Sequence, residues 1–133
     1  MKNITDKLFW VVVVAMGVYI LYSKGVIGTN FESVSAKVAY EMIQNDDNLT
    51  ILDVRTLEEF KVDGHLEDAK LLPLSHVAKN LNMVDKSKRV LVYCRSGNRS
   101  VTASRILEKN GYVVVNMRGG LSSWKAEKLP VER

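Results

Sequence analysis

An apolar run without a charged side chain, residues 8–22, constrains this chain most, because a helix that is apolar all round has little to pack against in a protein of 133 residues. As a helix, this run rises about 22 Å, less than the roughly 30 Å hydrocarbon core of a bilayer. Extension to Ile27 gives 20 residues, and the ammonium of Lys24 near that end can reach the membrane interface. Aromatic residues lie toward both ends of the run: Trp10, Tyr19 and Tyr22. We therefore expect residues 1–30 to be an N-terminal anchor with one transmembrane helix over about residues 8–27.

Two other interpretations of this run stay open. It is a buried helix of a soluble protein, or it is a cleaved signal peptide whose small-residue cleavage site is Val34-Ser35-Ala36. That site lies far from Tyr22, and it falls where the first helix of the following domain is expected to begin. An uncleaved single-span anchor is the preferred interpretation.

The remainder of the chain is close to neutral. The formal charge of the whole chain is +4, and residues 1–30 contribute +2 of it, from three lysines against Asp6, so +2 remains for residues 31–133. Without a basic run, or aromatic residues interleaved with Lys and Arg, no nucleic-acid partner is expected. The single cysteine excludes an internal disulfide and a cysteine-rich metal site.

Residues 31–133 alternate between helical and strand patterns. Helices are predicted at residues 35–44, 56–62, 75–81, 100–110 and 121–125, and strands at residues 49–54, 69–72, 89–93 and 112–117. This alternation predicts one α/β domain of three layers, with a central parallel sheet and helices on both faces.

Capping residues support several of the predicted helix ends. Ser33 or Ser35 can cap the first helix of the domain, and Thr56 with Glu59 three residues later forms a capping box. Ser75 can cap the helix that follows Pro73, and Gly111 can end the helix that begins near Ser100.

The only cysteine, Cys94, directly follows the continuous apolar strand at residues 89–93 and precedes the helix expected to start near Ser100. Ligands bind at this edge of open parallel sheets, beyond the carboxyl ends of the strands. A tight loop there turns backbone N–H groups inward, and the helix N-terminus adds a partial positive charge. These groups favour a thiolate at Cys94, which would then be a nucleophile.

Five motifs in this order resemble those of single-domain rhodaneses: ILDVRTLEEF (51–60), GH (64–65), LPLS (72–75), VLVYCRSGNRS (90–100) and MRGGLSSW (117–124). The resemblance covers about residues 33–130 and implies a rhodanese fold. The chain departs from the family at residues 66–69, Leu-Glu-Asp-Ala, where Ile-Pro-Gly-Ala is common.

The resemblance also implies a reaction. Cys94 would take a sulfane sulfur from a small anionic donor such as thiosulfate, form a persulfide, and pass the sulfur to a thiol, cyanide or protein acceptor, without cofactor or metal. The substrate-binding residues implied are Arg95, Ser96, Gly97, Asn98, Arg99 and Ser100. Their backbone N–H groups would hold the sulfur anion, Arg95 would attract the donor, Arg99 would brace the loop or line its rim, and Ser100 would cap the helix.

Loop length separates this family from the related phosphatases. Arg99 stands five positions after Cys94, as in rhodaneses, whereas protein tyrosine phosphatases have one more residue between the cysteine and the arginine. The sixth position here is Ser100. The shorter loop suits one added sulfur atom better than a tetrahedral phosphate.

Asp53 and Arg55 follow another strand and approach the same edge of the sheet. By resemblance they support the cysteine loop, Asp53 as a hydrogen-bond acceptor and Arg55 as an ionic brace or donor contact; the alternative is a surface ion pair. His65 is expected to be structural and Trp124 to pack the last helix on the domain.

Two questions stay open at this point. The domain is either a sulfurtransferase or a membrane-tethered persulfide carrier or docking module. The positive-inside rule slightly favours a cytoplasmic N-terminus and a periplasmic domain, because Lys2, Lys7 and the α-amino group precede the span, while Lys37 alone follows it once Lys24 is counted with the end of the span. A persulfide outside the cytoplasm would need protection from oxidation, so the cytoplasmic alternative remains.

Overall fold

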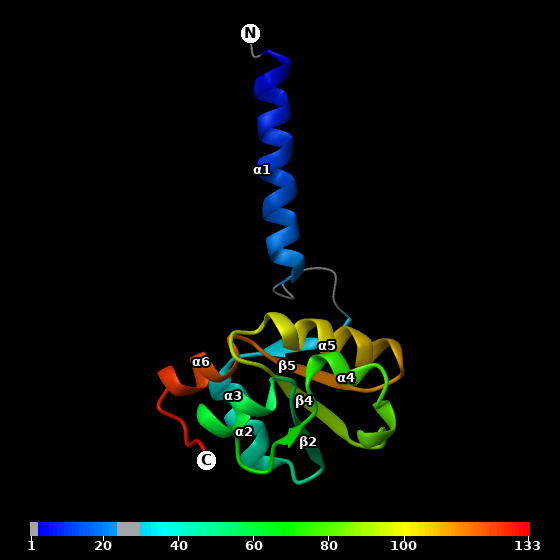
Figure 1. Cartoon of the computed structure of the whole chain (residues 1–133), viewed down its shortest axis with the longest axis vertical. Helices are drawn as coiled ribbons and strands as arrows, with labels where there is room; N and C mark the ends of the chain where they lie inside the picture. Colours follow the sequence, from blue (N-terminus) through cyan, green and yellow to red (C-terminus); the bar gives the residue numbers. More distant parts are fainter. Residues whose placement is uncertain (1–2, 24–29) are drawn as a thin grey trace.

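The N-terminal run forms a helix that projects away from the domain and contacts it at its end, where Arg105 donates to the Tyr22 carbonyl (Figure 1). The computed structural model describes residues 3–23 and 30–133, and within them α1 spans Ile4–Ser23. The helix begins four residues before the expected position, and the Asn3 side chain accepts a hydrogen bond from the amide of Asp6 at that end. The expected end of the span at residues 24–27 lies outside the described residues.

Among residues 30–133, the described strands form one parallel sheet in the order β1-β5-β4-β2-β3. The strands are β1 (Glu32–Val34), β2 (Leu49–Asp53), β3 (Lys70–Leu71), β4 (Arg89–Tyr93) and β5 (Val114–Met117). Four of them lie within predicted strands. The edge strand β1 was not predicted, because a strand of three residues is too short to show a period of two; Ser33 therefore pairs with β5 and caps no helix.

Helices cover both faces of the sheet, as predicted, and make the domain three-layered (Figure 1). They are α2 (Ala36–Asn45), α3 (Leu57–Val62), α4 (Leu74–Val77), α5 (Asn98–Lys109) and α6 (Gly120–Ala126), with a 3₁₀ turn at Leu81–Met83. One core cluster joins β2, β4 and β5 to α4 and α5, and the other joins the opposite faces of these strands to α2 and α6. Alternate residues of the central strands β4 and β5 therefore belong to different cores.

Two predicted caps are confirmed. The Ser35 hydroxyl accepts a hydrogen bond from the amide of Val38 at 3.2 Å and starts α2. Thr56 and Glu59 form the reciprocal capping box of α3. These ends could be predicted because every group involved lies within four residues of the chain.

Two predicted helix starts are wrong. The helix expected at residues 75–81 is the shorter α4, because the amide of Leu74 bonds to the Val54 carbonyl and ties the start of the turn to β2; Ser75 is inside it and not a cap. Helix α5 begins at Asn98, two residues before Ser100, and its N-cap is Gly97 with φ +105°. The Ser100 hydroxyl bonds to the Gly97 carbonyl, so its predicted capping role is also wrong.

Candidate active site

The loop Cys94–Gly97 connects β4 directly to α5 at the carboxyl edge of the sheet. The Sγ atom of Cys94 accepts a hydrogen bond from the amide of Gly97 at 3.1 Å, and the Ser100 hydroxyl lies 3.5 Å from it. Cys94 is 1% exposed. The Gly97 N–H and the positive end of the twelve-residue helix α5 thus point at one buried sulfur atom, and both favour negative charge there, while the Ser100 oxygen is placed to accept a hydrogen bond from the thiol.

Backbone amides in the first turn of α6 form hydrogen bonds with the backbone carbonyls of the cysteine loop. The amide of Leu121 donates to the Cys94 carbonyl at 2.8 Å, and the amide of Ser122 donates to the Arg95 carbonyl at 3.0 Å. A Cβ on Gly120 would lie 2.2 Å from the Cys94 carbonyl oxygen, and the residue has φ +55°, so only glycine fits. The glycine pair Gly119-Gly120 at the start of α6 belongs to one of the five motifs, but its contact with the cysteine loop was not predicted.

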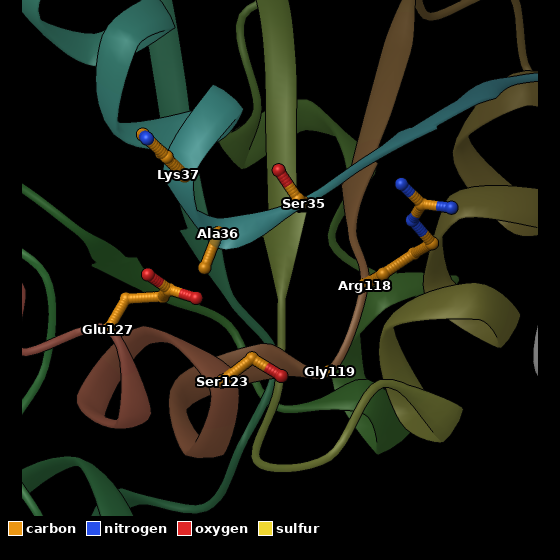
Figure 2. A pocket seen from close by; sticks show the side chains of 7 residues that line it. All are labelled: Ser35, Ala36, Lys37, Arg118, Gly119, Ser123 and Glu127. Atoms are coloured by element: carbon orange, nitrogen blue, oxygen red, sulfur yellow. The ribbon is translucent and has the colours of Figure 1, made fainter.

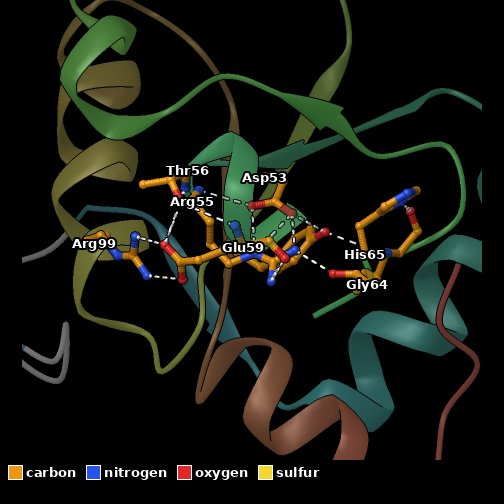
Figure 3. A network of polar contacts seen from close by, with 9 residues as sticks. Asp53, Arg55, Thr56, Glu59, Gly64, His65 and Arg99 are labelled. Carbon is orange, nitrogen blue, oxygen red and sulfur yellow. Dashed lines mark hydrogen bonds and ion pairs between the residues drawn. The ribbon is translucent and has the colours of Figure 1, made fainter. Parts of the chain in front are cut away.

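Arg99 braces the loop to α3. Its two terminal nitrogens donate to the two carboxylate oxygens of Glu59 at 2.7 and 2.8 Å (Figure 3). The hydrogen bonds from Arg99 are the main reason that the pKa of Glu59 falls to about 2. Of the two predicted roles for Arg99, the geometry supports bracing. Glu59 was expected only as a capping residue of α3. Its ion pair with Arg99 was not predicted, because nothing in the sequence around Glu59 indicates a contact with a residue 40 positions away.

Asp53 and Arg55 form a buried ion pair near the loop (Figure 3). Both side chains are fully buried, and the guanidinium of Arg55 contacts both oxygens of Asp53, at 2.7 Å for the shortest contact. Arg55 also donates to the Gly64 carbonyl at 2.7 Å. The alternative of a surface ion pair is therefore wrong. Because the Arg55 side chain has no exposed surface, its position fits an ionic brace and not a direct contact with a sulfur donor from solution.

Tyr93 links this pair to the cysteine loop. Its hydroxyl donates to Asp53 at 2.6 Å and accepts from the amide of Leu66 at 3.2 Å. Burial is the main cause that raises the pKa of Tyr93. Because successive strand residues point to opposite faces, Tyr93 and Cys94 belong to different core clusters. The Asp53 network thus fixes the end of β4 through the backbone, from the face opposite the sulfur.

A family model described as a rhodanese-like domain matches residues 35–127. The chain belongs to this family. A sulfurtransferase of Allochromatium vinosum is 34% identical over 101 residues, which cover 75% of this chain and 89% of that protein. Bacillus subtilis YrkF, named a putative sulfur carrier protein, is 30% identical over 97 residues, 72% of this chain and 52% of that one. The crystal structure of a rhodanese-related protein from Thermoplasma volcanium has a TM-score of 0.70 at 32% identity and covers 76% of this chain and 97% of its own.

Beside the cysteine loop, this rhodanese domain has a cavity of about 230 Å³. Arg95 and Lys125 line it with Asp63, Leu121 and Ser122. Arg95 is exposed, as expected for a residue near the pocket mouth, and so are Ser96 and Asn98 in the same loop. Lys125 and Ser122 were not predicted as site residues, because nothing in the α6 segment alone shows that this helix faces the cysteine loop.

A larger cavity of about 400 Å³ is lined by Gly119 and by residues of the β1–α2 connection (Figure 2). It is lined from the β1–α2 and β5–α6 connections, and Lys37 and Arg118 lie on opposite sides of it. These two cations do not converge on one point. The smaller cavity, which adjoins the backbone of the cysteine loop, is the better candidate for a donor site of the rhodanese domain.

The remaining predicted residues pack the domain. The His65 ring stacks on Phe60, with centroids 3.8 Å apart, and its Nδ1 lies 2.9 Å from the Leu66 carbonyl. Trp124 is 2% exposed and donates to the Pro130 carbonyl, which confirms that it packs α6 on the domain.

Proposed function

We propose that this rhodanese domain is a sulfurtransferase with Cys94 as its nucleophile. The observation that carries the proposal is the position of Cys94 Sγ, which receives the Gly97 N–H at the start of α5. Thiolate attack on the outer sulfur of thiosulfate forms a Cys94 S–S bond and breaks the S–S bond of the donor. Sulfite leaves with the bonding electron pair as a dianion, and the transferred sulfur keeps the negative charge that it carried in thiosulfate, now as the terminal sulfur of the persulfide.

The backbone of residues 95–99 would stabilise that terminal sulfur anion, in the manner of an oxyanion hole. A phosphatase is a poorer fit. Both terminal nitrogens of Arg99 already bind the carboxylate of Glu59, so this guanidinium is turned toward α3 and not toward the centre of the loop. A compact loop whose arginine is held elsewhere supports transfer of single sulfur atoms.

The donor would be small and anionic. Arg95 and Lys125 place two cations at the cavity next to the loop, and only Asp63 opposes them among its lining residues. A thiol, cyanide or a protein would then accept the sulfur. No step of this reaction requires a cofactor.

A carrier function is the second candidate. YrkF supports it by name, since a persulfide held in a buried loop can also be passed on without turnover of a free donor. The two functions differ in rate and acceptor. Sulfite release with thiosulfate and cyanide, compared with transfer to protein thiols, distinguishes them.

We also propose that residues 1–30 anchor the domain of residues 31–133 in a membrane. Within the described residues, α1 is the helix long and apolar enough to cross one, with a mean hydropathy of 1.9 and no buried part, although a signal sequence has the same properties. For its orientation we propose a cytoplasmic N-terminus and a periplasmic domain, which the lysine distribution slightly favours over a domain in the cytoplasm.

Mass spectrometry tests the chemistry directly. Incubation with thiosulfate should add about 32 Da, one sulfur, to Cys94. Cys94→Ser should remain folded, gain no mass and release no sulfite. Sulfite release by the serine variant, or a sulfonate in place of the persulfide, would disprove the mechanism.

A further inference from the structure

Three charged side chains of opposite sign line the cavity beside the cysteine loop without pairing with one another. Asp63 is half-buried there, while Arg95 and Lys125 are exposed. Among the described residues, no hydrogen bond or ion pair joins the Asp63 carboxylate to either cation, and neither cation pairs with another carboxylate. The cavity therefore has one negative and two positive groups whose charges are open to a ligand.

The Asp63 carboxylate contributes little to the helix that it follows. Asp63 is the C-cap of α3, and its backbone amide donates to the Glu59 carbonyl. A carboxylate at this end of a helix is disfavoured by the negative end of the helix dipole. The backbone of the next residue, Gly64, is fixed because its carbonyl accepts a hydrogen bond from the buried Arg55 at 2.7 Å. The fold thus holds an unpaired carboxylate on a fixed backbone at the edge of the cavity.

These charges favour a ligand that carries both signs. A simple anion such as thiosulfate is attracted by Arg95 and Lys125 but repelled by Asp63. A molecule with a carboxylate and an ammonium group would find a partner for each. The cavity of about 230 Å³ is smaller than the roughly 300–1,000 Å³ of pockets that enclose drug-sized ligands, so the ligand is a small molecule.

We propose that Asp63 selects, as the sulfur acceptor, a thiol that is also an α-amino acid, the chemistry of free cysteine. The inference rests on the sulfurtransferase function proposed above. Asp63 binds the α-ammonium group, and Arg95 and Lys125 bind the carboxylate. The bound thiol lies next to the cysteine loop, since Leu121 in the cavity wall bonds through its amide to the Cys94 carbonyl.

The transfer to this acceptor needs no added oxidant or reductant. The acceptor sulfur attacks the outer sulfur of the Cys94 persulfide and forms a new S–S bond with it. The bond between the outer sulfur and Sγ breaks, and its electron pair stays on Sγ, which becomes a thiolate again. The proton of the acceptor thiol moves to the transferred sulfur. The product is the persulfide of the amino acid, and Cys94 is ready for the next donor.

Two acceptors that differ only in the α-ammonium group test this assignment. The full chain in detergent is loaded with thiosulfate to the adduct of about 32 Da and freed from excess donor, and L-cysteine or 3-mercaptopropionate is then added. Loss of the adduct, followed by intact mass, gives a rate for each thiol. Because the two thiols differ in intrinsic reactivity, the quantity compared between wild type and Asp63→Asn is the ratio of the cysteine rate to the 3-mercaptopropionate rate.

This ratio should fall about threefold to fivefold in Asp63→Asn, as expected for the loss of an ion pair open to solvent. Asp47→Asn, which removes the same charge at an exposed position between α2 and β2, should keep the ratio of the wild type. An unchanged ratio in Asp63→Asn, or an equal fall in Asp47→Asn, would overturn the role of Asp63 while the sulfur chemistry stands. A wild-type chain that gains no adduct would refute the sulfurtransferase function and this inference with it.

Discussion

The backbone amide of Gly97 donates a hydrogen bond to the sulfur of Cys94 over 3.1 Å, from a residue with φ +105°. The left-handed conformation turns this N–H inward at the start of α5, so the conformation of one glycine determines the hydrogen bond that the sulfur accepts. A side chain at this position would disfavour the conformation.

We first predict that Gly97→Ala lowers the rate of persulfide formation at least tenfold, because about 1–2 kcal/mol of backbone strain moves the N–H away from the sulfur. Stopped incubations with thiosulfate, followed by intact mass, measure this rate. Gly111→Ala is the matched control, since Gly111 has φ +87° and meets only the flexible Lys86 side chain. It should lose similar stability and keep its activity; equal rate losses in both variants would contradict the role of Gly97.

Glu59→Gln should destabilise the domain by about 1 kcal/mol, because Arg99 loses its charged partner and the capping box is weakened. The pKa of Glu59 is lowered from its ordinary value of 4.5 to about 2 in the folded protein, mainly by its hydrogen bonds with Arg99. This stabilisation is therefore complete above about pH 4.5 and is lost as pH falls through that window toward 2.

Urea unfolding at several pH values measures this effect. The stability difference between wild type and Glu59→Gln should narrow below about pH 4, while Glu58→Gln, an exposed neighbour in the same turn, should change little at any pH. A pH-independent difference would show that the charge of Glu59 is not the cause.

Tyr93→Phe should cost about 1–3 kcal/mol, because the Leu66 amide and one Asp53 oxygen each lose a buried partner. Sulfite release should also fall several-fold as the end of β4 loosens. Tyr112→Phe also removes a hydroxyl that donates to backbone carbonyls, those of Leu81 and Val84, at the opposite edge of the sheet. The Tyr112 variant should lose stability but not activity, and a parallel loss of activity would refute the link through Asp53.

Lys125→Ala should raise the KM for thiosulfate about threefold to fivefold with little change in kcat, because it removes one cation from the cavity beside the loop. The KM of the wild type should rise with salt more steeply than that of the variant. Lys79→Ala removes an exposed lysine of the same charge from the α4 side and serves as the control. A KM unchanged in Lys125→Ala would assign the donor to another cavity.

The full chain should fractionate with membranes and resist a carbonate wash. A chain found in the soluble fraction with Met1 still attached would contradict the anchor.

The orientation of the domain can be measured by thiol labelling, which requires an exposed cysteine because Cys94 is buried. Ser87→Cys in a Cys94→Ser background supplies an exposed thiol. Labelling of intact spheroplasts by a membrane-impermeant maleimide is expected for a periplasmic domain, and labelling only after lysis would place the domain in the cytoplasm.

The sequence alone determined the features that depend on near neighbours in the chain. The capping box of Thr56 and Glu59, the strand ending at Tyr93 and the cysteine that follows it could be predicted, since each involves residues within one turn or one strand. The order of five motifs also identified the family, which the comparison with family models confirmed.

Only the tertiary structure decided which of these segments meet. Strand β4 lies between β2 and β5, so α3 and α6 both reach the loop after β4, and Glu59, Gly120 and Lys125 contact or flank it from distant positions in the chain. Alternation of strands and helices does not specify strand order, and a one-residue step reverses the face of a side chain. For this reason Asp53 was placed at the correct edge of the sheet, while its contact with Tyr93, on the face opposite the sulfur, appeared only in the folded chain.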